Sequence, residues 1–326
     1  MTAPPIRCAV VGLGRIASLL ERDNRREKPA THVGAIVDNP RCTLVGGADI
    51  DPERRRLFGQ DWQCAALYED AAKMVVESDP DILVVATHPD SHLRYVRLAA
   101  THGVPVAVCE KPLADTLRRG RRIAALHRRG AVTVITNHER RYSADYIRAR
   151  TTVREERYGR LLSVRGTLYF GRTTRRDRVL LHDGTHMVDA INYLTDAVTR
   201  FNRRVGALRS HRGSTILHGT AGDIPVTLEV GSERDYLLFE IELSFEGGRV
   251  RVGNGVEAWE RSEESPYYEG YRSLVPEEIS RGGDHRTGYF ANMIADAVAC
   301  VDDPRREPRS SAADALEVLR FIKRRR

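Results

Sequence analysis

One lysine draws attention in this chain because lysine is otherwise almost absent. Of the 52 lysine and arginine residues, only Lys28, Lys73, Lys111 and Lys323 are lysines. Lys111 lies in the tripeptide Glu110-Lys111-Pro112, directly after the apolar run 104–108. An arginine side chain stays charged, whereas a primary amine can share or give up a proton when it is buried. A lysine retained at the end of an expected strand therefore suggests a site that needs an ammonium group.

A glycine-rich turn near the N-terminus is the second feature with chemical meaning. The apolar run 6–11 leads into Gly12-Leu13-Gly14-Arg15-Ile16-Ala17 and then into a helical pattern. This is G-x-G-x-x-G with alanine in the third place, in the strand–turn–helix context that the motif requires. The glycines permit a tight turn and a close approach to a pyrophosphate, while the following helix presents free N–H groups. We therefore predict that Gly12, Gly14, Arg15 and Ile16 bind a dinucleotide.

An acidic residue at the end of the second strand is expected to hold the adenosine ribose. Asp49 occupies that position, although it lies further from the glycines than the usual ~20 residues. An insertion over residues 21–31, between helix and strand, explains the excess. A carboxylate accepts ribose hydroxyls but repels a 2′-phosphate, so NAD is predicted over NADP, and the arginines at 54–56 weaken this preference. Asp51 is an alternative, though Asp51-Pro52 is more typical of a helix start.

The composition fits a globular protein of two domains. The chain has 326 residues, of which 41% are hydrophobic and 30% charged. Apolar stretches are too short for a bilayer, and the N-terminal residues lack the pattern of a secretory signal. Five scattered cysteines favour reduced thiols, and the histidines show no metal-ligand spacing. The net charge of +7 is interleaved with acids along the chain. We expect a cytoplasmic protein with no metal and no membrane or nucleic-acid partner.

The elements that must position these residues form two different patterns. Before residue 137 we predict strands over 6–11, 43–48, 82–86, 104–108 and 132–136, separated by helices over 15–22, 69–78, 91–102 and 116–129. Strands that are apolar throughout and alternate with helices are typical of a parallel sheet covered on both faces. The fold predicted for residues 1–136 is therefore an α/β, doubly wound Rossmann domain.

The second part of the chain, residues 137–326, is predicted to be an α+β domain for substrate binding and oligomerisation. Expected helices cover 143–157 and 186–194, and expected strands cover 161–170, 216–221, 226–230, 237–245 and 249–252. Consecutive strands joined by short turns favour a mainly antiparallel, open sheet. Residues 262–284 are the most loop-like stretch. Closing helices over 287–300 and 311–324 are expected to pack back on the first domain.

Several motifs in a fixed order carry a family resemblance. They are Gly12-Leu13-Gly14 with Asp49, the segments Ala86–His92 and Glu110–Pro112, and then Asn137–Tyr142 and His182–Asp189. Over nearly the whole chain they resemble the glucose–fructose oxidoreductase / inositol dehydrogenase / rhizopine-catabolism (Gfo/Idh/MocA) family. The joint match is specific for the fold and the cofactor and much less specific for the substrate.

The resemblance implies particular roles at the centre of the site. Lys111 would sit at the nicotinamide and contact the reacting hydroxyl, and His186 would be the acid/base. The family usually has an aspartate four residues before that histidine, whereas this chain has His182 there, with Asp183 beside it. Residues four apart share a helix face, so His182 and His186 can converge as a catalytic pair if the helix begins early enough. Asp183 would then cap the helix.

Other residues of the motifs are expected to surround the cofactor and substrate. The further cofactor contacts are Thr87, His88, His92 and Glu110, and the substrate contacts are Arg141, Asp183 and His186. His92 is more simply explained as a contact at a helix start that supports the cofactor than as a catalyst. For Arg141, a structural ion pair is an equal alternative.

Together these features predict an NAD(H)-dependent dehydrogenase or reductase acting on CH–OH groups. Hydride would pass between nicotinamide and a secondary hydroxyl or ketone of a sugar, a cyclitol or a sugar derivative. Two other functions stay open, namely a non-catalytic NAD-binding sensor, which the departure at His182 keeps possible, and an NAD-dependent glycosidase. The open sheet and the family resemblance favour a homo-dimer or homo-tetramer.

Overall fold

The computed structural model describes residues 4–171, 179, 183–201, 214–281 and 287–323. The chain separates into two compact units, one formed by Met1–Tyr142 with Gly288–Arg326 and the other by Ser143–Thr287. The first unit thus continues a few residues beyond the boundary expected at residue 136, and both closing helices belong to it.

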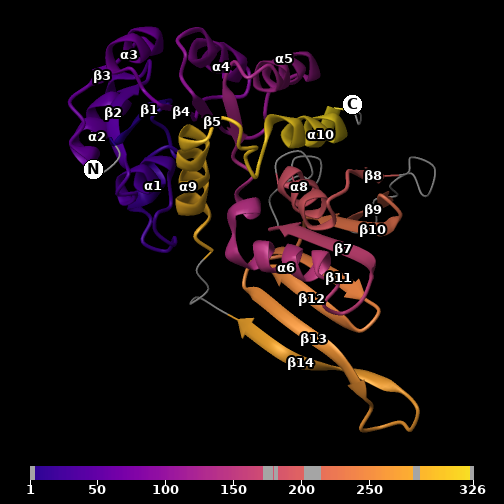
Figure 1. Cartoon of the computed structure of the whole chain (residues 1–326). Coiled ribbons are helices and arrows are strands. Elements are labelled where there is room, and N and C mark those ends of the chain that lie inside the picture. Colours follow the sequence, from indigo (N-terminus) through magenta and orange to yellow (C-terminus); the bar gives the residue numbers. More distant parts are fainter. Residues whose placement is uncertain (1–3, 172–178, 180–182, 202–213, 282–286, 324–326) are drawn as a thin grey trace. The chain divides into compact units, whose positions relative to one another are not determined.

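The first unit is built on a six-stranded parallel sheet (Figure 1). Its strand order is β3-β2-β1-β4-β5-β6, which is the order of a doubly wound Rossmann domain. The strands are β1 (Ile6–Val11), β2 (Cys42–Ala48), β3 (Leu67–Tyr68), β4 (Ile82–Val85), β5 (Val106–Cys109) and β6 (Thr133–Thr136). The order reverses between β1 and β4, and ligands bind such sheets at the carboxyl ends of the strands beside this reversal. The predicted fold class is confirmed.

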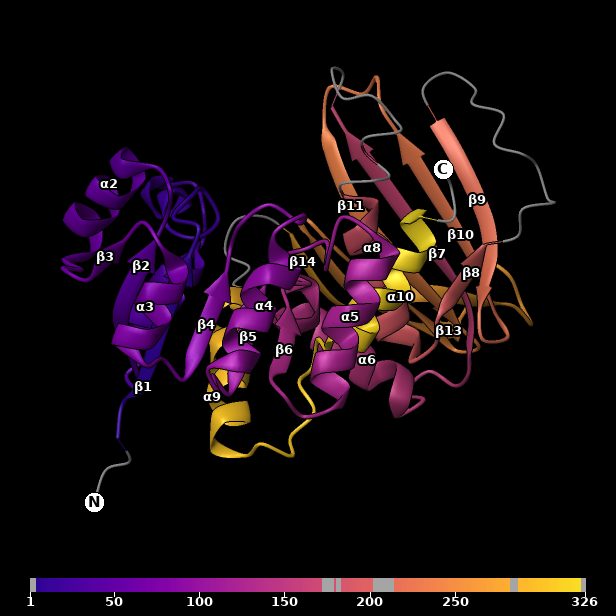
Figure 2. The same cartoon turned by 90° about the horizontal axis from the view of Figure 1, so that it is seen from above.

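Helices cover both faces of this sheet (Figure 2). One face packs against α3 (Ala71–Ser78), α4 (His92–Thr101), α5 (Leu117–Arg128) and α10 (Ala312–Lys323), and the other against α1 (His32–Asp38), α2 (Pro52–Trp62) and α9 (Tyr289–Asp302). In β1, Ala9 and Val11 point to the first face, and Cys8 and Val10 point to the second. This alternation explains why the strands are apolar throughout, since both sides of each strand are buried.

The helix predicted over residues 15–22 is wrong, because the insertion interrupts the helix itself. Turns follow the glycines, then a 3-10 helix η1 (Leu19–Arg22), and the α-helix α1 begins only at His32. The backbone N–H of Val33 nevertheless donates to Ala17 O at 3.0 Å, as in a helix that continues across the insertion. Thr31 starts α1, because its side chain accepts a hydrogen bond from the N–H of Gly34.

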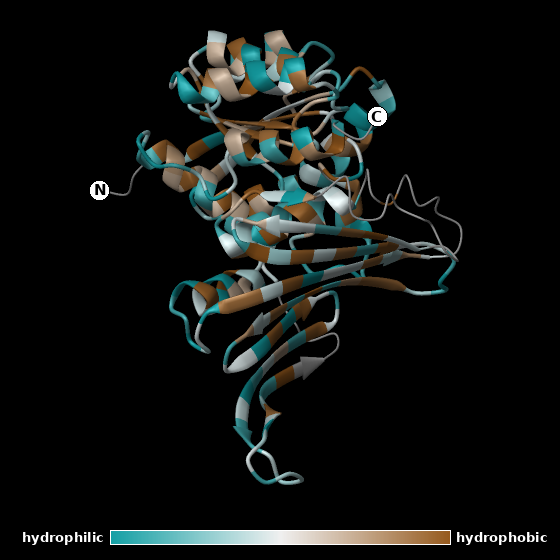
Figure 3. Ribbon diagram, turned by 90° about the vertical axis from the view of Figure 1, so that its right-hand side faces the viewer, coloured by the Kyte–Doolittle hydropathy of each residue, from teal (hydrophilic) through white to brown (hydrophobic). Residues whose placement is uncertain are grey.

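The second unit contains an eight-stranded sheet in the order β14-β13-β12-β11-β7-β10-β9-β8. The strands are β7 (Leu161–Phe170), β8 (Thr199–Phe201), β9 (Ser214–Ala221), β10 (Ile224–Gly231), β11 (Leu237–Phe245), β12 (Gly248–Gly253), β13 (Val256–Glu264) and β14 (Arg272–Arg281). Only the β7–β10 pair among them is parallel. Buried and more exposed residues alternate along β11, and Figure 3 shows this alternation as changes of hydropathy along the strands. The predicted open, mainly antiparallel sheet is confirmed.

Two helices, α6 (Ala144–Arg154) and α8 (Gly184–Thr195), pack on each other and on this sheet. The helix α8 comes very close to β7, since a Cβ atom added to Gly166 would lie 2.9 Å from Met187 Sδ. A glycine in the strand therefore permits the close packing of the helix that carries His186.

The prediction of a loop over residues 262–284 is wrong for most of that range. Residues 256–264 and 272–281 form the last two strands, paired antiparallel at the edge of the sheet. Pro276 in β14 faces Glu260 where the pairing shifts register. A proline is tolerated in a strand mainly at an edge or a bulge, and both conditions apply here. Among the described residues, no helix combines the length and apolar character needed to cross a bilayer.

Candidate functional site

The glycine-rich turn follows β1 and is closely surrounded by the neighbouring strand ends. The N–H of Gly12 donates to Ala48 O at 2.8 Å, and Gly12 has a φ of +86°. A Cβ atom there would lie 2.7 Å from Ala86 O, so only glycine fits. In the part of the chain that the structure describes, the N–H groups of Gly14, Arg15 and Ile16 donate to no protein acceptor. These donors, in a turn that Gly14 leaves open, fit the pyrophosphate of a dinucleotide.

Asp49 lies directly beside this turn at the end of β2. Its side chain is buried, and Oδ2 accepts a hydrogen bond from the N–H of Leu13 at 2.8 Å. Oδ1 accepts from the N–H of Asp51 at 3.0 Å. Asp51 itself caps α2 by accepting from Glu53 and Arg54 N–H, as expected for a helix start. The geometry therefore favours Asp49 over Asp51 as the ribose ligand.

Arg54 lies beside Asp49 and the glycine turn. Its Nη1 atom lies 3.6 Å from Asp49 Oδ2, and its Nε atom lies 3.6 Å from Asp51 Oδ2. The side chain is half exposed, and its guanidinium lies 3.9 Å from where a Cβ on Gly14 would be. A half-exposed cation this close to Asp49 partly offsets the charge that would repel a 2′-phosphate.

The two glycines are expected to respond differently to alanine. Gly12→Ala should lower the free energy of unfolding by about 2 kcal/mol or more, because it combines a positive φ with a backbone clash. Gly14→Ala should leave the melting temperature near the wild-type value but raise the Kd for NADH at least about tenfold, since its Cβ enters open space needed by the pyrophosphate. Thermal unfolding and quenching of NADH fluorescence measure the two effects. Equal melting temperatures for both variants would contradict this account of the turn.

The loop after β4 is held together by His92, which is completely buried. Its Nε2 atom lies 3.0 Å from Thr87 O and its Nδ1 atom 3.3 Å from Leu113 O. Burial lowers the pKa of His92, although both carbonyl contacts oppose this effect, so the ring is neutral at neutral pH and donates only one hydrogen bond. His92 thus braces two loops at the carboxyl edge of the sheet, which favours a supporting role over catalysis. Exposed His88 and half-buried Thr87 lie in the same loop.

Glu110 and Lys111 follow β5 at the same edge of the sheet. Glu110 is buried, and its Oε1 atom lies 2.7 Å from His32 Nε2 and 2.6 Å from Asn137 Nδ2. Its Oε2 atom accepts from the N–H of Lys111 at 3.2 Å. Burial by itself would raise the pKa of Glu110, but the hydrogen bond and charge of His32, with Asn137 and Lys111, lower it overall. Glu110 is therefore an anchored carboxylate that fixes the backbone of Lys111.

Two members of this cluster have no role in the sequence prediction. Asn137 belongs to a motif that we considered, and its N–H donates to Cys109 O at 2.8 Å, which places it next to Glu110. His32 lies beyond the insertion in a segment without a recognised motif. The sequence signal that could have found it is a histidine on the apolar face of α1, between buried neighbours.

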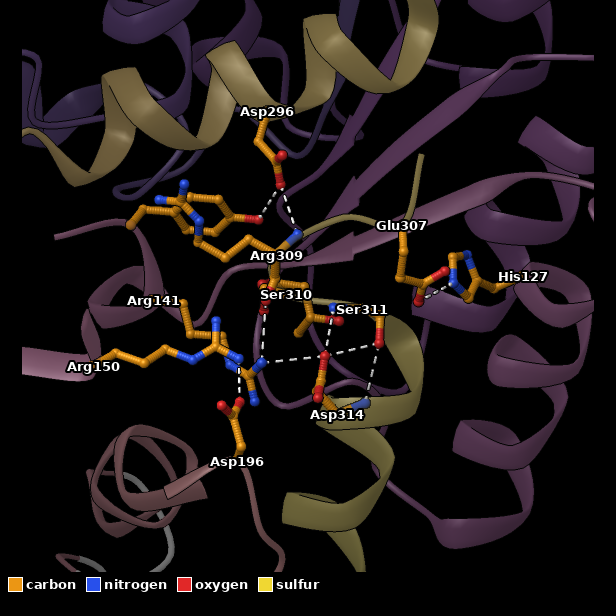
Figure 4. A network of polar contacts seen from close by, with 12 residues as sticks. His127, Arg141, Arg150, Asp196, Asp296, Glu307, Arg309, Ser310, Ser311 and Asp314 are labelled. Atoms are coloured by element: carbon orange, nitrogen blue, oxygen red, sulfur yellow. Dashed lines mark hydrogen bonds and ion pairs between the residues drawn. The ribbon is translucent and has the colours of Figure 1, made fainter. Parts of the chain in front are cut away.

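Arg141 lies in the 3-10 helix η2 (Glu139–Tyr142) and is buried in a network with the C-terminal segment (Figure 4). Its Nη1 atom donates to Arg309 O at 3.1 Å and lies 3.2 Å from Asp314 Oδ2. Ser310 Oγ donates to Thr136 O at 2.7 Å, so the same segment also holds the end of β6. These contacts favour the structural ion pair for Arg141. A substrate contact stays a prediction.

The second unit carries the remaining candidates on the first turn of α8. Asp183 is the N-cap residue, and its carbonyl oxygen accepts from the N–H of His186 at 3.0 Å. Its side chain accepts no capping hydrogen bond among the described residues, in contrast to the expectation. The His186 side chain is buried. His182 lies outside the described residues, so its catalytic role stays a prediction, as does the role of His186.

Comparison with known proteins gives matches over different parts of the chain. Residues 6–138 match the sequence model of a family described as "Oxidoreductase family, NAD-binding Rossmann fold". The chain is 30% identical over 216 residues to D-apiose dehydrogenase of Paraburkholderia graminis, a match covering 61% of this chain and 54% of that protein. It is 26% identical over 247 residues to inositol 2-dehydrogenase of Acidothermus cellulolyticus, covering 74% and 67%. The chain thus spans about half the length of the first of these relatives.

A solved structure supports the fold over the whole chain. The dehydrogenase from Chromobacterium violaceum has a TM-score of 0.78 and 18% sequence identity, covering 99% of this chain and 94% of that one. The predicted resemblance to the Gfo/Idh/MocA family is confirmed over residues 6–138, which match the model of that family's NAD-binding Rossmann fold.

Proposed function

We propose that this protein transfers hydride between NAD and a secondary hydroxyl or ketone of a sugar, a cyclitol or a sugar derivative. The observation that carries the proposal is the position of Lys111 after β5. The carboxyl ends of parallel strands lie at one edge of a sheet. Lys111 comes directly after β5, so it lies at the same edge as the glycine turn after β1 and Asp49 after β2. The names of the relatives, dehydrogenases of D-apiose and of inositol, agree with a polyhydroxylated substrate.

In the proposed reaction a bound nicotinamide would accept or donate the hydride. The substrate loses hydride from carbon and a proton from oxygen, and a ketone is the product. Lys111, as an ammonium group, stabilises negative charge on the substrate oxygen while the proton leaves. In the reverse direction the same group polarises the carbonyl. His186, as a neutral imidazole, takes the proton and returns it in the reverse reaction.

We propose NAD rather than NADP as the cofactor because of Asp49. The carboxylate is buried beside the glycine turn, where it can accept the ribose hydroxyls and would repel a 2′-phosphate. Arg54 opposes this preference through its position 3.6 Å from the same carboxylate. We therefore expect a preference for NAD that is moderate rather than absolute, of about tenfold to hundredfold in kcat/KM.

A panel of polyols, keto-sugars and nucleotide sugars, assayed with both cofactors, tests the proposal. We expect a change in the absorbance of the reduced cofactor with at least one class of sugar or cyclitol, and faster turnover with NAD. Binding of NAD without turnover across the whole panel would instead support the sensor. Release of an aglycone from a glycoside without net formation of NADH would support the glycosidase. Either result would overturn the dehydrogenase assignment.

A further inference from the structure

The buried histidine at the start of α1 contacts both halves of the proposed cofactor site. The backbone N–H of His32 donates to Ile16 O at 3.3 Å, in the glycine-rich turn. Its side chain is completely buried, and Nε2 lies 2.7 Å from Glu110 Oε1, next to Lys111. One residue therefore joins the turn that fits a pyrophosphate to the turn that carries the proposed catalytic lysine.

The hydrogen bonds around Glu110 determine which nitrogen of His32 carries a proton. A carboxylate only accepts hydrogen bonds, so Nε2 of His32 must be the donor. Asn137 Nδ2 donates to the same oxygen at 2.6 Å, and the N–H of Lys111 donates to the other oxygen at 3.2 Å. Phe290 packs edge-on against the imidazole, with ring centroids 5.3 Å apart and planes at 80°. The ring is thus held in one orientation with a defined donor.

We propose that His32 is a positioning residue that keeps Glu110 ionised and thereby fixes the position of Lys111 relative to the glycine turn. The inference rests on the proposed function for the role of Lys111. Without His32, Glu110 would lose one of its three donors in a site where burial disfavours its charge. The backbone of Lys111 would then lose a charged anchor, and a small displacement near the reacting atoms lowers the rate strongly.

The groups that face Glu110 come from several elements. They are His32 on α1, Lys111 after β5, His92 on α4, Cys109 on β5 and the neutral amide of Asn137. The net result is a lowered pKa for Glu110, so its contribution to stability is present above the unfolded pKa and disappears as the pH falls through the folded pKa. Removing His32 should raise the pKa of Glu110. The acid limb of the melting temperature should then move to higher pH.

Two substitutions of His32 and one of His127 form the test. Leucine removes the donor, whereas glutamine carries a terminal amide that can reach the position of Nε2. His127 on α5 is the matched control, because its Nε2 atom also contacts a glutamate, at 3.2 Å from Glu307 Oε1, and its Nδ1 atom accepts from Val134 N–H. For each variant, kcat, KM for NAD and melting temperature are measured as functions of pH.

We expect His32→Leu to lower kcat by about tenfold to hundredfold and to move the acid limb of the melting temperature upward by about one pH unit. His32→Gln should restore most of the kcat and most of the position of the acid limb. His127→Leu should leave the acid limb at its wild-type pH. A loss of melting temperature that is the same at every pH, or a glutamine variant as impaired as the leucine variant, would overturn the inference.

The dependence of the melting temperature on pH keeps this test separate from the proposed function. If the wild-type protein turned over no member of the substrate panel, the dehydrogenase assignment would fail while the unfolding measurements could still be compared. An upward shift of the acid unfolding limb in His32→Leu, absent in His127→Leu, would support the anchoring of Glu110. Identical limbs in the three proteins would reject it.

Discussion

Replacing Lys111 with alanine is expected to lower kcat about a hundredfold or more while the Kd for NADH changes little. The dinucleotide would be held mainly by the glycine turn and Asp49, which the substitution does not touch. The lost ammonium group would have stabilised charge that exists fully only in the transition state, so kcat falls rather than affinity. A hundredfold loss corresponds to about 2.7 kcal/mol. Steady-state kinetics and titration of NADH fluorescence measure the two quantities.

Two control variants separate the chemistry of Lys111 from its charge and from general effects of lysine loss. Lys111→Arg keeps a cation but replaces a compact amine by a larger planar fork that does not fit the same position beside the substrate oxygen, so we expect it to remain strongly impaired. Lys73→Ala removes an exposed lysine that pairs with Glu77 at 3.7 Å on α3, and it should behave like the wild-type protein. Near-normal turnover in Lys111→Ala would remove the basis of the proposed mechanism.

The fold of the first unit could be predicted from the sequence because its signals are local. Strands buried on both faces, such as β1 and β4, are continuous apolar runs, and the helices between them begin and end at recognisable residues. The short strand β3 was not predicted, because two residues carry no periodicity. Its position is set by pairing with β2, which is a tertiary effect.

The errors in the fold have physical causes that a local pattern does not contain. We predicted the insertion to follow the first helix. In the structure the N–H of Val33 donates to Ala17 O across the insertion, so the helix resumes after it. Glu21 helps to close the inserted loop, because its side chain accepts a hydrogen bond from the N–H of Ala30. Strand β14 was taken for a loop because its side chains are mostly exposed and it contains Pro276. Edge strands often have such compositions, which protect them from pairing with other chains.

The candidate site divides in the same way between local motifs and contacts distant in sequence. Gly12 and Gly14 were predicted from a strand–turn–helix pattern and Asp49 from its place at the end of the second strand. The structure brings Asp49 to Leu13, with a hydrogen bond of 2.8 Å. His32 and Asn137 were missed as partners of Glu110, because their contact depends on three separate segments meeting at one edge of the sheet. Sequence spacing alone could not show this, since the insertion hides the relation of His32 to the glycines.

Replacing His186 with alanine is expected to lower the rate of alcohol oxidation about a hundredfold or more at neutral pH. A base must be deprotonated to act, so oxidation by the wild-type protein should decline in acid, and this decline should be lost or altered in His186→Ala. Added imidazole should restore part of the activity, because a free base can take the proton in place of the missing side chain. The measurements are kcat across a pH series, with and without imidazole.

The burial of His186 in α8 leaves a purely structural role as the competing explanation, and two variants decide between them. His186→Gln retains a polar side chain that can form hydrogen bonds but cannot act as a base near neutral pH, so it should melt close to the wild-type temperature and remain inactive. His218→Ala removes an exposed histidine of β9, whose Nδ1 atom lies 3.3 Å from Thr227 Oγ1, and should change neither property. If His186→Gln were active, the imidazole would serve packing and not proton transfer, and the search for the base would move to His182 and Asp183 on the same segment.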